Sequence, residues 1–192
     1  MKELAEQHDD WLLFEEDECW FSRFAQPNTF GWAEKGEPVR FTQRTPSPKE
    51  PDKALACFGA VRQDNQQTYL YFADGQPNSE NLWLFIIALL ALARHEAKKV
   101  VVMLWDNASW HKSQRIRQWI RAYNQQAKRM GEPRLWTWLL PLQSPWLNPI
   151  EPRWFHAKRA VCEPDGDLPA VELKRRLSVH FDMEPFWNSQ TI

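Results

Sequence analysis

The feature that most constrains the fold of this 192-residue chain is a continuous apolar run, residues 99–106 (KVVVMLWD), that ends in an acid. Apolar residues without alternation are typical of a strand that is covered on both faces. Such strands belong to α/β sheets with helices on each side. We therefore expect Asp106 at the carboxyl end of a central strand, the edge where ligands of open α/β sheets gather.

The segments around this run predict a mixed sheet. The polar residues 63–66 separate two β-rich runs and predict a hairpin. Helical spacing and capping residues predict helices that begin near Asn78, Ser113 and Pro149. Three antiparallel strands are then followed by α-β units, which gives a mixed five-stranded α/β sheet flanked by helices. The predicted strands are 11–16, 54–62, 67–73, 99–106 and 134–140, and a last helix covers about 169–181.

Length and composition favour one intracellular domain. A chain of 192 residues suffices for one domain and is too short for two ordinary ones. The longest apolar run, residues 82–93, is shorter than the roughly 17–25 residues of a membrane span. The three cysteines lie far apart and form no CxxC pair, which argues against a zinc site or a disulfide framework. We expect a single domain over residues 1–192, in the reducing cytoplasm and without a membrane segment.

Charge is distributed unevenly along the chain. Residues 1–18 hold eight acids and one base, whereas residues 98–134 hold nine bases and two acids. A basic segment of this kind suits a polyanion, and it equally suits a solvated helix face. Charge alone therefore leaves both interpretations open.

Three acids stand out by their positions in the predicted elements. Asp17 follows the first strand, Asp106 ends the fourth, and Glu151 opens a helix after the fifth. If strands one and four are neighbours, both aspartates project at one edge of the sheet, and a helix packed over that edge adds the glutamate. Asp106 as a capping residue and Glu151 as a first-turn acid are the simpler alternatives.

Three clustered carboxylates repel one another unless cations lie between them. Hard oxygen ligands without histidine or thiolate favour Mg²⁺ or Mn²⁺ over zinc. Two such ions, roughly 3.5–4 Å apart, would activate a water or a 3′-hydroxyl for in-line attack on a phosphodiester. The acids therefore predict metal-dependent chemistry on nucleic acid.

Asp17 has acidic neighbours that compete for its role. Period-two alternation puts Glu15 and Asp17 on one face of the strand, and Glu16 and Glu18 on the other. We prefer Asp17 as the member of the triad. Glu18 is expected to be solvated or to support the site from beside it.

Two segments carry a resemblance to a known family. Residues 100–113 (VVVMLWDNASWHKS), followed by residues 140–161 (LPLQSPWLNPIEPRWFHAKRAV), closely resemble the second and third acidic motifs of mariner-like bacterial insertion-sequence transposases of the DDE superfamily. The first motif resembles residues 12–21 (LLFEEDECWF), with GWAEKG downstream at 31–36. The resemblance implies a ribonuclease H-like fold, and metal-dependent DNA cleavage and strand transfer.

Carried onto this sequence, the family's motifs assign a role to each matching residue. Asp17, Asp106 and Glu151 would be the catalytic, metal-binding triad for two Mg²⁺ or Mn²⁺ ions. Asn107 and His111 match the residues that flank the second aspartate, and are expected to position substrate or support the triad. By the same resemblance, Asn148 belongs to the turn that aims Glu151. The expected DNA contacts are Lys112, Arg115, Arg153, Lys158, Arg159, Trp110 and Trp146.

The family usually places helix-turn-helix modules before the first aspartate, whereas 16 residues precede Asp17 here. We therefore expect a catalytic domain whose end recognition comes from a separate helix-turn-helix polypeptide, or else a remnant or repurposed domain. The expected partners are transposon ends and target DNA in the nucleoid, with a homodimer as one option. The alternatives are a ribonuclease H-like nuclease without strand transfer and a domesticated, non-catalytic DNA-binding protein.

Overall fold

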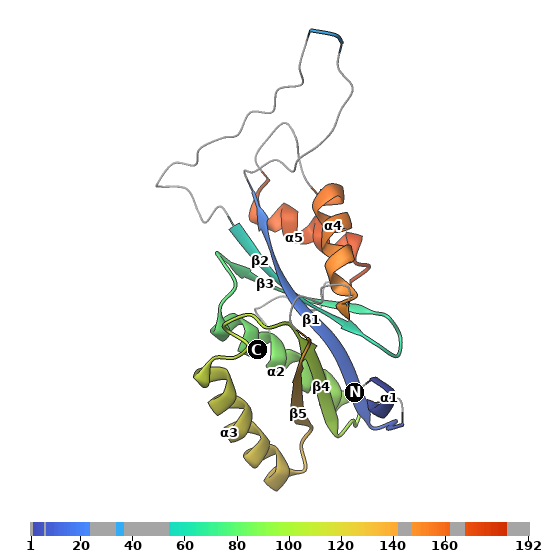
Figure 1. Ribbon diagram of the computed structural model, residues 1–192, viewed down its shortest axis with the longest axis vertical. Helices are drawn as coiled ribbons and strands as arrows, with labels where there is room; N and C mark the ends of the chain where they lie inside the picture. Colours follow the sequence, from blue (N-terminus) through green and yellow to red (C-terminus); the bar gives the residue numbers. More distant parts are fainter. Residues whose placement is uncertain are drawn as a thin grey trace.

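A mixed five-stranded sheet lies at the centre of the computed structural model, which describes residues 2–5, 7–23, 34–36, 54–141, 147–161 and 168–183. The strand order is β3-β2-β1-β4-β5 (Figure 1). β1, β2 and β3 are antiparallel neighbours, and β4 and β5 continue the sheet parallel to β1. The predicted sheet is thereby confirmed, with bounds β1 Trp11–Ser22, β2 Ala54–Arg62, β3 Thr68–Asp74, β4 Val100–Trp105 and β5 Arg134–Leu139.

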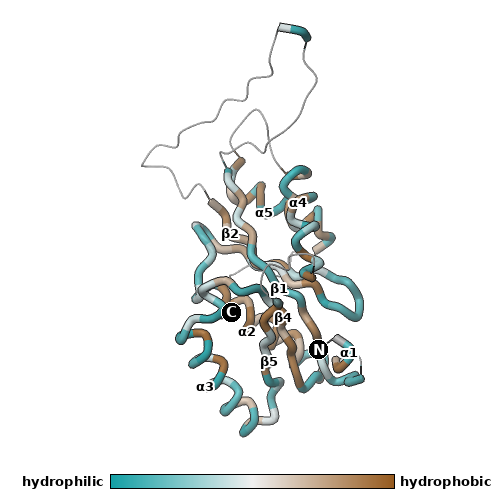
Figure 2. Tube along the Cα trace, viewed as in Figure 1, coloured by the Kyte–Doolittle hydropathy of each residue, from teal (hydrophilic) through white to brown (hydrophobic). Residues whose placement is uncertain are grey.

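Helices cover both faces of this sheet. Even-numbered residues of β1, such as Leu12 and Phe14, share a core with α2 and α3, whereas Cys19 and Phe21 share a core with α4 and α5. In Figure 2 the hydrophobic stretches follow the strands, and α3 is largely hydrophilic. Among the described helices, none combines the length and the apolar content that crossing a membrane requires. Their bounds are α1 Lys2–Ala5, α2 Ser79–His95, α3 Gln114–Met130, α4 Ile150–Val161 and α5 Ala170–His180.

The ends of α2 and α3 follow the predicted capping chemistry. The Asn78 side chain accepts hydrogen bonds from the backbone N–H groups of Glu80 and Asn81. Ser113 Oγ accepts from the N–H of Ile116, and α3 stops at Gly131, whose φ of 70° suits glycine. These local signals fix where α3 begins, directly after the loop that follows Asp106.

Strand β1 is longer than the sequence predicts, and this corrects the expected place of Asp17. The strand continues through the acids to Ser22, so Asp17 lies within it, opposite Gly59 of β2, and does not follow it. β4 pairs only with residues 11–15 of β1, whereas β2 pairs with residues 14–22. The hydrogen bonds to β2 keep the acidic half of β1 extended, which a pattern of apolar residues alone does not reveal.

Gly59 allows α4 to approach the sheet closely. A Cβ atom at this position would lie 2.5 Å from Ile150 Cδ1 and 2.5 Å from Trp154 Cη2. Real Cβ atoms do not come so close to carbon, so any larger residue would push α4 away from β2. The bare backbone of Gly59 therefore sets the distance between Asp17, on the neighbouring strand, and the helix that carries Glu151.

We expect Gly59→Ala to lower the free energy of unfolding by about 1–3 kcal/mol, because an added methyl group overpacks this contact. Gly131→Ala is the matched control: its Cβ meets nothing within 4 Å, and only its φ of 70° is strained, at a cost of about 1 kcal/mol. Hydrogen exchange should rise in α4 for Gly59→Ala alone. Equal exchange in α4 for the two variants would contradict the proposed contact.

Candidate active site

The two predicted aspartates lie level with each other, one within β1 and one directly after β4. β1 and β4 are parallel, and their register runs from Trp11 opposite Val100 to Glu15 opposite Leu104. Continued by two residues, the same register brings Asp106 level with Asp17. Asp106 is the first residue after β4, and its side chain is 52% exposed. The topology thus places one half-exposed and one largely buried carboxyl group at the same edge.

Glu151 joins them through the attachment of α4 to β1. Trp154, one turn after Glu151, donates its Nε1–H to Asp17 Oδ2 at 3.2 Å. The buried Asn148, just before α4, donates from Nδ2 to the backbone oxygen of Glu16 at 3.1 Å. These two bonds hold the first turn of α4, with the exposed Glu151, beside the acidic half of β1.

The pKa of Asp17 responds to the charges of the other two acids. Burial and the neighbouring carboxylate of Glu18 raise the pKa of Asp17 to about 7, and the charges of Asp106 and Glu151 act on it in the same direction. Asp106 and Glu151 are therefore near enough to Asp17 for their charges to act on it. Carboxylates that gather in this way are stabilised by cations.

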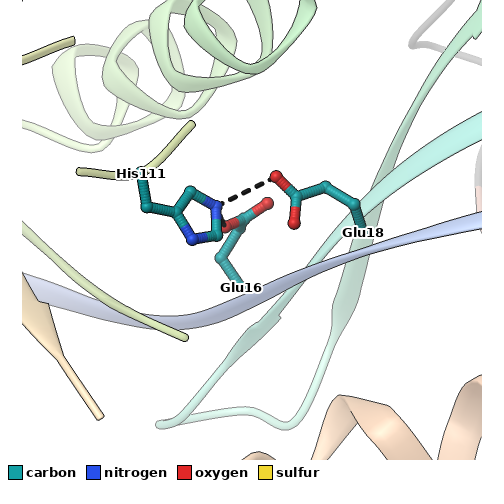
Figure 3. A group of neighbouring side chains, drawn as sticks. All are labelled: Glu16, Glu18 and His111. Carbon is teal, nitrogen blue, oxygen red and sulfur yellow. Dashed lines mark hydrogen bonds and ion pairs between the residues drawn. The ribbon is translucent and has the colours of Figure 1, made fainter. Parts of the chain in front are cut away.

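His111 lies beside Glu16 and Glu18, with a ring nitrogen directed towards Glu18 (Figure 3). Its buried imidazole stacks on Trp105, with ring centroids 4.7 Å apart. Nδ1 lies 2.8 Å from Asp106 Oδ1, while Nε2 lies 2.9 Å from Glu18 Oε1 and 3.4 Å from Glu16 Oε2. The ring thus connects the exposed Asp106 with two buried glutamates of β1.

These contacts determine the charge of His111. Burial by itself would lower its pKa, but hydrogen bonds to Asp106, Glu16 and Glu18 outweigh burial and raise the pKa to about 12. The hydrogen bond from His111 in turn holds the pKa of Asp106 below its ordinary value. The acceptors at both ring nitrogens therefore favour the imidazolium form of His111, which orients the Asp106 carboxylate.

Glu16, Glu18 and His111 resemble a metal site in geometry alone. One potential ligand atom from each lies within 4.8 Å of the others. Without a bound metal, the three side chains form a buried network in which His111 Nε2 contacts both glutamates. Burial, with the charge of Glu18, raises the pKa of Glu16 to about 8, which limits the negative charge that the network holds.

The sequence did not reveal this network. The solvated position considered for Glu18 is wrong: its side chain is 3% exposed, and it accepts hydrogen bonds from Trp110 Nε1 at 2.7 Å and from His111. The sequence signal that could have predicted it is the period-two alternation of β1, which places Glu16 and Glu18 on the face that α2 and α3 cover. The role of Trp154 was also missed, although its place three residues after Glu151 puts both on one side of α4.

Asn107 and Trp110 serve the protein's own architecture. Asn107 Nδ2 donates to the backbone oxygen of Leu140 at 2.6 Å, which ties the loop after β4 to the end of β5. Trp110 uses its N–H for Glu18 and packs partly buried against the core below α2 and α3. A substrate-positioning role for Asn107 and base stacking by Trp110 stay predictions.

Two of the arginines expected to contact DNA are engaged within the protein. Arg115 pairs with Glu80 at 2.6 Å, and its guanidinium lies 4.6 Å above the ring of Trp119. Arg153 donates to the backbone oxygen of Gln66 at 3.1 Å and to the hydroxyl of Thr68 in the β2–β3 hairpin. These contacts favour an anchoring role for both side chains.

The other expected DNA contacts are exposed or lie outside the described residues. Lys112, Lys158 and Arg159 are exposed, and the Arg159 guanidinium lies 3.9 Å above the ring of Phe155. Trp146 falls in the part of the chain that the structure does not describe. The role of each in DNA binding stays a prediction.

With this geometry in place, residues 16–165 match the family model of the DDE superfamily endonucleases. The chain belongs to this family. All three acids lie within the matched residues, which agrees with the resemblance seen in the motifs. No curated protein sequence matches the chain.

Solved structures of the Mos1 mariner transposase share the fold of this DDE endonuclease domain. The Mos1 paired-end complex with the left transposon end matches with a TM-score of 0.61 at 20% identity, over 90% of this chain and 48% of the Mos1 chain. The Mos1 strand transfer complex gives a TM-score of 0.59 at 17% identity, over 90% and 47%. The paired-end complex with Mn gives 0.59 at 19%, over 90% and 48%. The fold is thus the predicted ribonuclease H-like fold, and the chain spans about half the length of the Mos1 chains.

The buried charges of the site predict how stability depends on pH without divalent metal. The pKa values of His111 (about 12), Glu16 (about 8) and Asp17 (about 7) are all raised by folding. Each group contributes stability that is fully present below its unfolded pKa and is lost as the pH rises through its folded pKa. Between pH 6 and 8 all three contributions fall together.

Urea unfolding in EDTA should therefore give a free energy of unfolding that declines from pH 6 to pH 8. The variant Glu16→Gln should decline less steeply, because it removes one of the three titrations. A free energy that stays level or rises over this interval in the wild-type chain would show that the buried network is not charged as described.

Proposed function

We propose that this domain is the catalytic domain of a DDE transposase, which cuts DNA at transposon ends and joins the 3′-hydroxyl ends to target DNA. The observation that carries the proposal is the placement of Asp17 and Asp106 on neighbouring parallel strands, with the helix of Glu151 held against Asp17 by Trp154. Membership of the DDE superfamily endonucleases and the Mos1-like fold support it.

The donor set fits two Mg²⁺ or Mn²⁺ ions held by Asp17, Asp106 and Glu151. All three donors are carboxylates, and the nearest imidazole, His111, is protonated and bonded to Asp106. When bound, such ions lower the pKa of a water or 3′-hydroxyl and stabilise the oxygen that leaves the phosphorus. Mos1 complexes with Mn and with Mg are known structures, which supports this choice of metal.

In this proposal the chain's own residues orient the three carboxylates and balance their charge. Trp154 fixes one oxygen of Asp17, and His111 fixes one oxygen of Asp106, so that the remaining oxygens are free for ligands. The exposure of Glu151 and Asp106 keeps the site open to a bulky polyanion such as DNA. No side chain has to act as the nucleophile, because water and the 3′-hydroxyl fill that role.

We also propose that residues 1–192 form one catalytic domain, and that a helix-turn-helix part recognises the transposon ends. The match of residues 16–165 to one family model supports the single domain. The Mos1 chains are about twice as long as this chain, which leaves room for such a part on this or a separate polypeptide. A paired, homodimeric arrangement on DNA belongs to the same proposal.

The triad is tested with Asp106→Asn and Glu151→Gln, which keep the shape of each side chain and remove its charge. We expect nicking of supercoiled plasmid in Mn²⁺ to fall by more than the ~10–100-fold typical of losing a residue that only supports a metal ligand. Glu3→Gln, which removes an exposed carboxylate from α1, is the control and should keep full activity. Persistent nicking by either triad variant would show that the assignment is wrong.

The reaction type is decided by the products from labelled transposon-end DNA and a target plasmid. A transposase joins the labelled 3′ end to the plasmid. Hydrolysis without joining would instead identify a ribonuclease H-like nuclease, and binding without either product would identify a DNA-binding protein.

Metal binding should also stabilise the fold. Millimolar Mn²⁺ should raise the Tm of the wild-type chain by mass action, equivalent to about 2.7 kcal/mol at a hundredfold excess over Kd. In Asp106→Asn the shift should be much smaller, because one ligand is gone. Equal shifts in the two proteins, measured by scanning calorimetry, would place the bound ions elsewhere.

A further inference from the structure

Two adjoining pockets form a groove between α3 and the edge strand β5, which lie next to each other in Figure 1. The first pocket, of about 380 Å³, is lined by Lys112, Arg117 and Trp138 among others. The second, of about 350 Å³, is lined by Arg121, Lys128, Arg134 and Trp136 among others. Ile120 lines both pockets, so they adjoin one another, and together they are called the α3–β5 groove.

The groove carries five cationic side chains and no acid. Neither pocket has a carboxylate in its lining, and within the described residues Lys112, Arg117, Arg121, Lys128 and Arg134 form no ion pair. Arg117, Arg121 and Lys128 follow one another along a single stripe of α3, with helical spacing. A solvated helix face usually mixes both signs of charge, so this one-signed stripe favours a polyanion.

Tryptophan side chains accompany the charges. Trp138 lines the first pocket and is 56% exposed, which is unusual for so large an apolar side chain. Trp136 lines the second pocket, half-buried, with the Arg134 guanidinium 5.8 Å above its ring. Cations beside an exposed aromatic ring are an arrangement that binds unpaired nucleic acid strands through phosphates and stacked bases, and Trp138 is the exposed ring, since Trp136 packs edge-on against Trp11.

The groove begins at the active site. His111, which lines the first pocket, bonds Asp106 Oδ1 at 2.8 Å, and Lys112 is the next residue. A strand that passes the three acids can therefore continue directly into the groove. From Arg117 to Lys128 the stripe extends roughly 16 Å along the helix, which is long enough for a few nucleotides.

A peptide strand is a poorer occupant than a nucleic acid strand. Asn124 of α3 donates from Nδ2 to the backbone oxygen of Leu135 at 2.7 Å and accepts from the Leu135 N–H at 2.8 Å. It thereby occupies the backbone groups that β5 would offer to an added β-strand. The start of this sheet edge is closed, whereas the cations and Trp138 beside it are accessible.

We propose that the α3–β5 groove binds a single unpaired DNA strand, with the phosphates on the stripe of cations and a base stacked on Trp138. That the strand is DNA rests on the proposed function. That the groove binds a phosphate backbone and a stacked base rests on its cations and Trp138 alone. In a reaction on transposon ends, the groove would hold a few unpaired nucleotides next to the cleaved bond. It is a second DNA contact, distinct from the three acids.

Binding is measured by fluorescence anisotropy in EDTA, so that catalysis plays no part, with a labelled 12-nucleotide oligo-dT. The groove variant combines Arg117→Gln, Arg121→Gln and Lys128→Gln. The control variant removes the same charge elsewhere, through Arg94→Gln, Lys99→Gln and Lys174→Gln. We expect about tenfold weaker binding for the groove variant alone. The slope of its log affinity against log salt should be smaller by about 2, because each phosphate that is no longer neutralised reduces the slope by ~0.7.

The role of Trp138 is measured with Trp138→Ala and an abasic oligonucleotide of equal length. Trp138→Ala should weaken oligo-dT binding about tenfold and leave abasic binding unchanged, because only stacking is removed. The proposal is overturned if the groove and control variants weaken binding equally, or if Trp138→Ala affects both oligonucleotides alike. It is also overturned if oligo-Asp of equal charge competes as well as oligo-dT, since the groove would then be an acidic-peptide site.

Asp106→Asn separates this proposal from the proposed function. This variant should bind oligo-dT like the wild-type chain while it fails to nick plasmid. If the wild-type chain binds oligo-dT through the groove but never cleaves DNA, the groove stands and the transposase proposal fails. If the wild-type chain cleaves DNA and the groove variant binds oligo-dT as tightly as wild type, the transposase proposal stands and the groove proposal fails.

Discussion

Four consecutive acids in the central strand of the sheet set the physical constraint on which the structure depends. Carboxylates are costly to bury unless partners satisfy them. The chain meets this constraint differently on the two faces of β1. Towards α2 and α3, a protonated His111 lies between Glu16 and Glu18, whereas towards α4 Trp154 donates a single hydrogen bond to Asp17. On the first face one imidazole thus contacts two glutamates, and on the second face Asp17 remains an acid of the proposed metal site.

Both faces are tied to the same edge of the sheet. His111 reaches across the end of β4 to Asp106, and Asn148 anchors the start of α4 to the backbone of β1. Gly59 completes the arrangement, because its missing side chain lets α4 rest against β2. The proposed catalytic acids therefore belong to a strand, a strand end and a helix whose relative positions are fixed by buried contacts and not by loops.

Helix α3 begins near the acids and leads away from them. It starts immediately after the loop that carries Asn107, Trp110 and His111, so the side chains that hold Asp106 also set the direction of the helix. Its apolar side packs on the core, and its cations line the groove beside β5. The negative site and the positive groove lie end to end, which suits a ligand that carries negative charge along its length and needs metal at one point.

The sequence by itself determined the order of the strands and of the helices from α2 onwards, the caps of α2 and α3, and the family, and it selected the three acids of the proposed site. Each of these can be inferred from local patterns of a few neighbouring residues. Only the tertiary structure decided that β1 continues through its acids, that Glu18 is buried, and that Arg115 and Arg153 have partners within the protein. Those outcomes depend on contacts between distant segments, such as the bond between Glu18 and His111, which lie 93 residues apart. A local pattern shows which side of a strand a carboxylate faces, but not which side chain from elsewhere in the chain will meet it there.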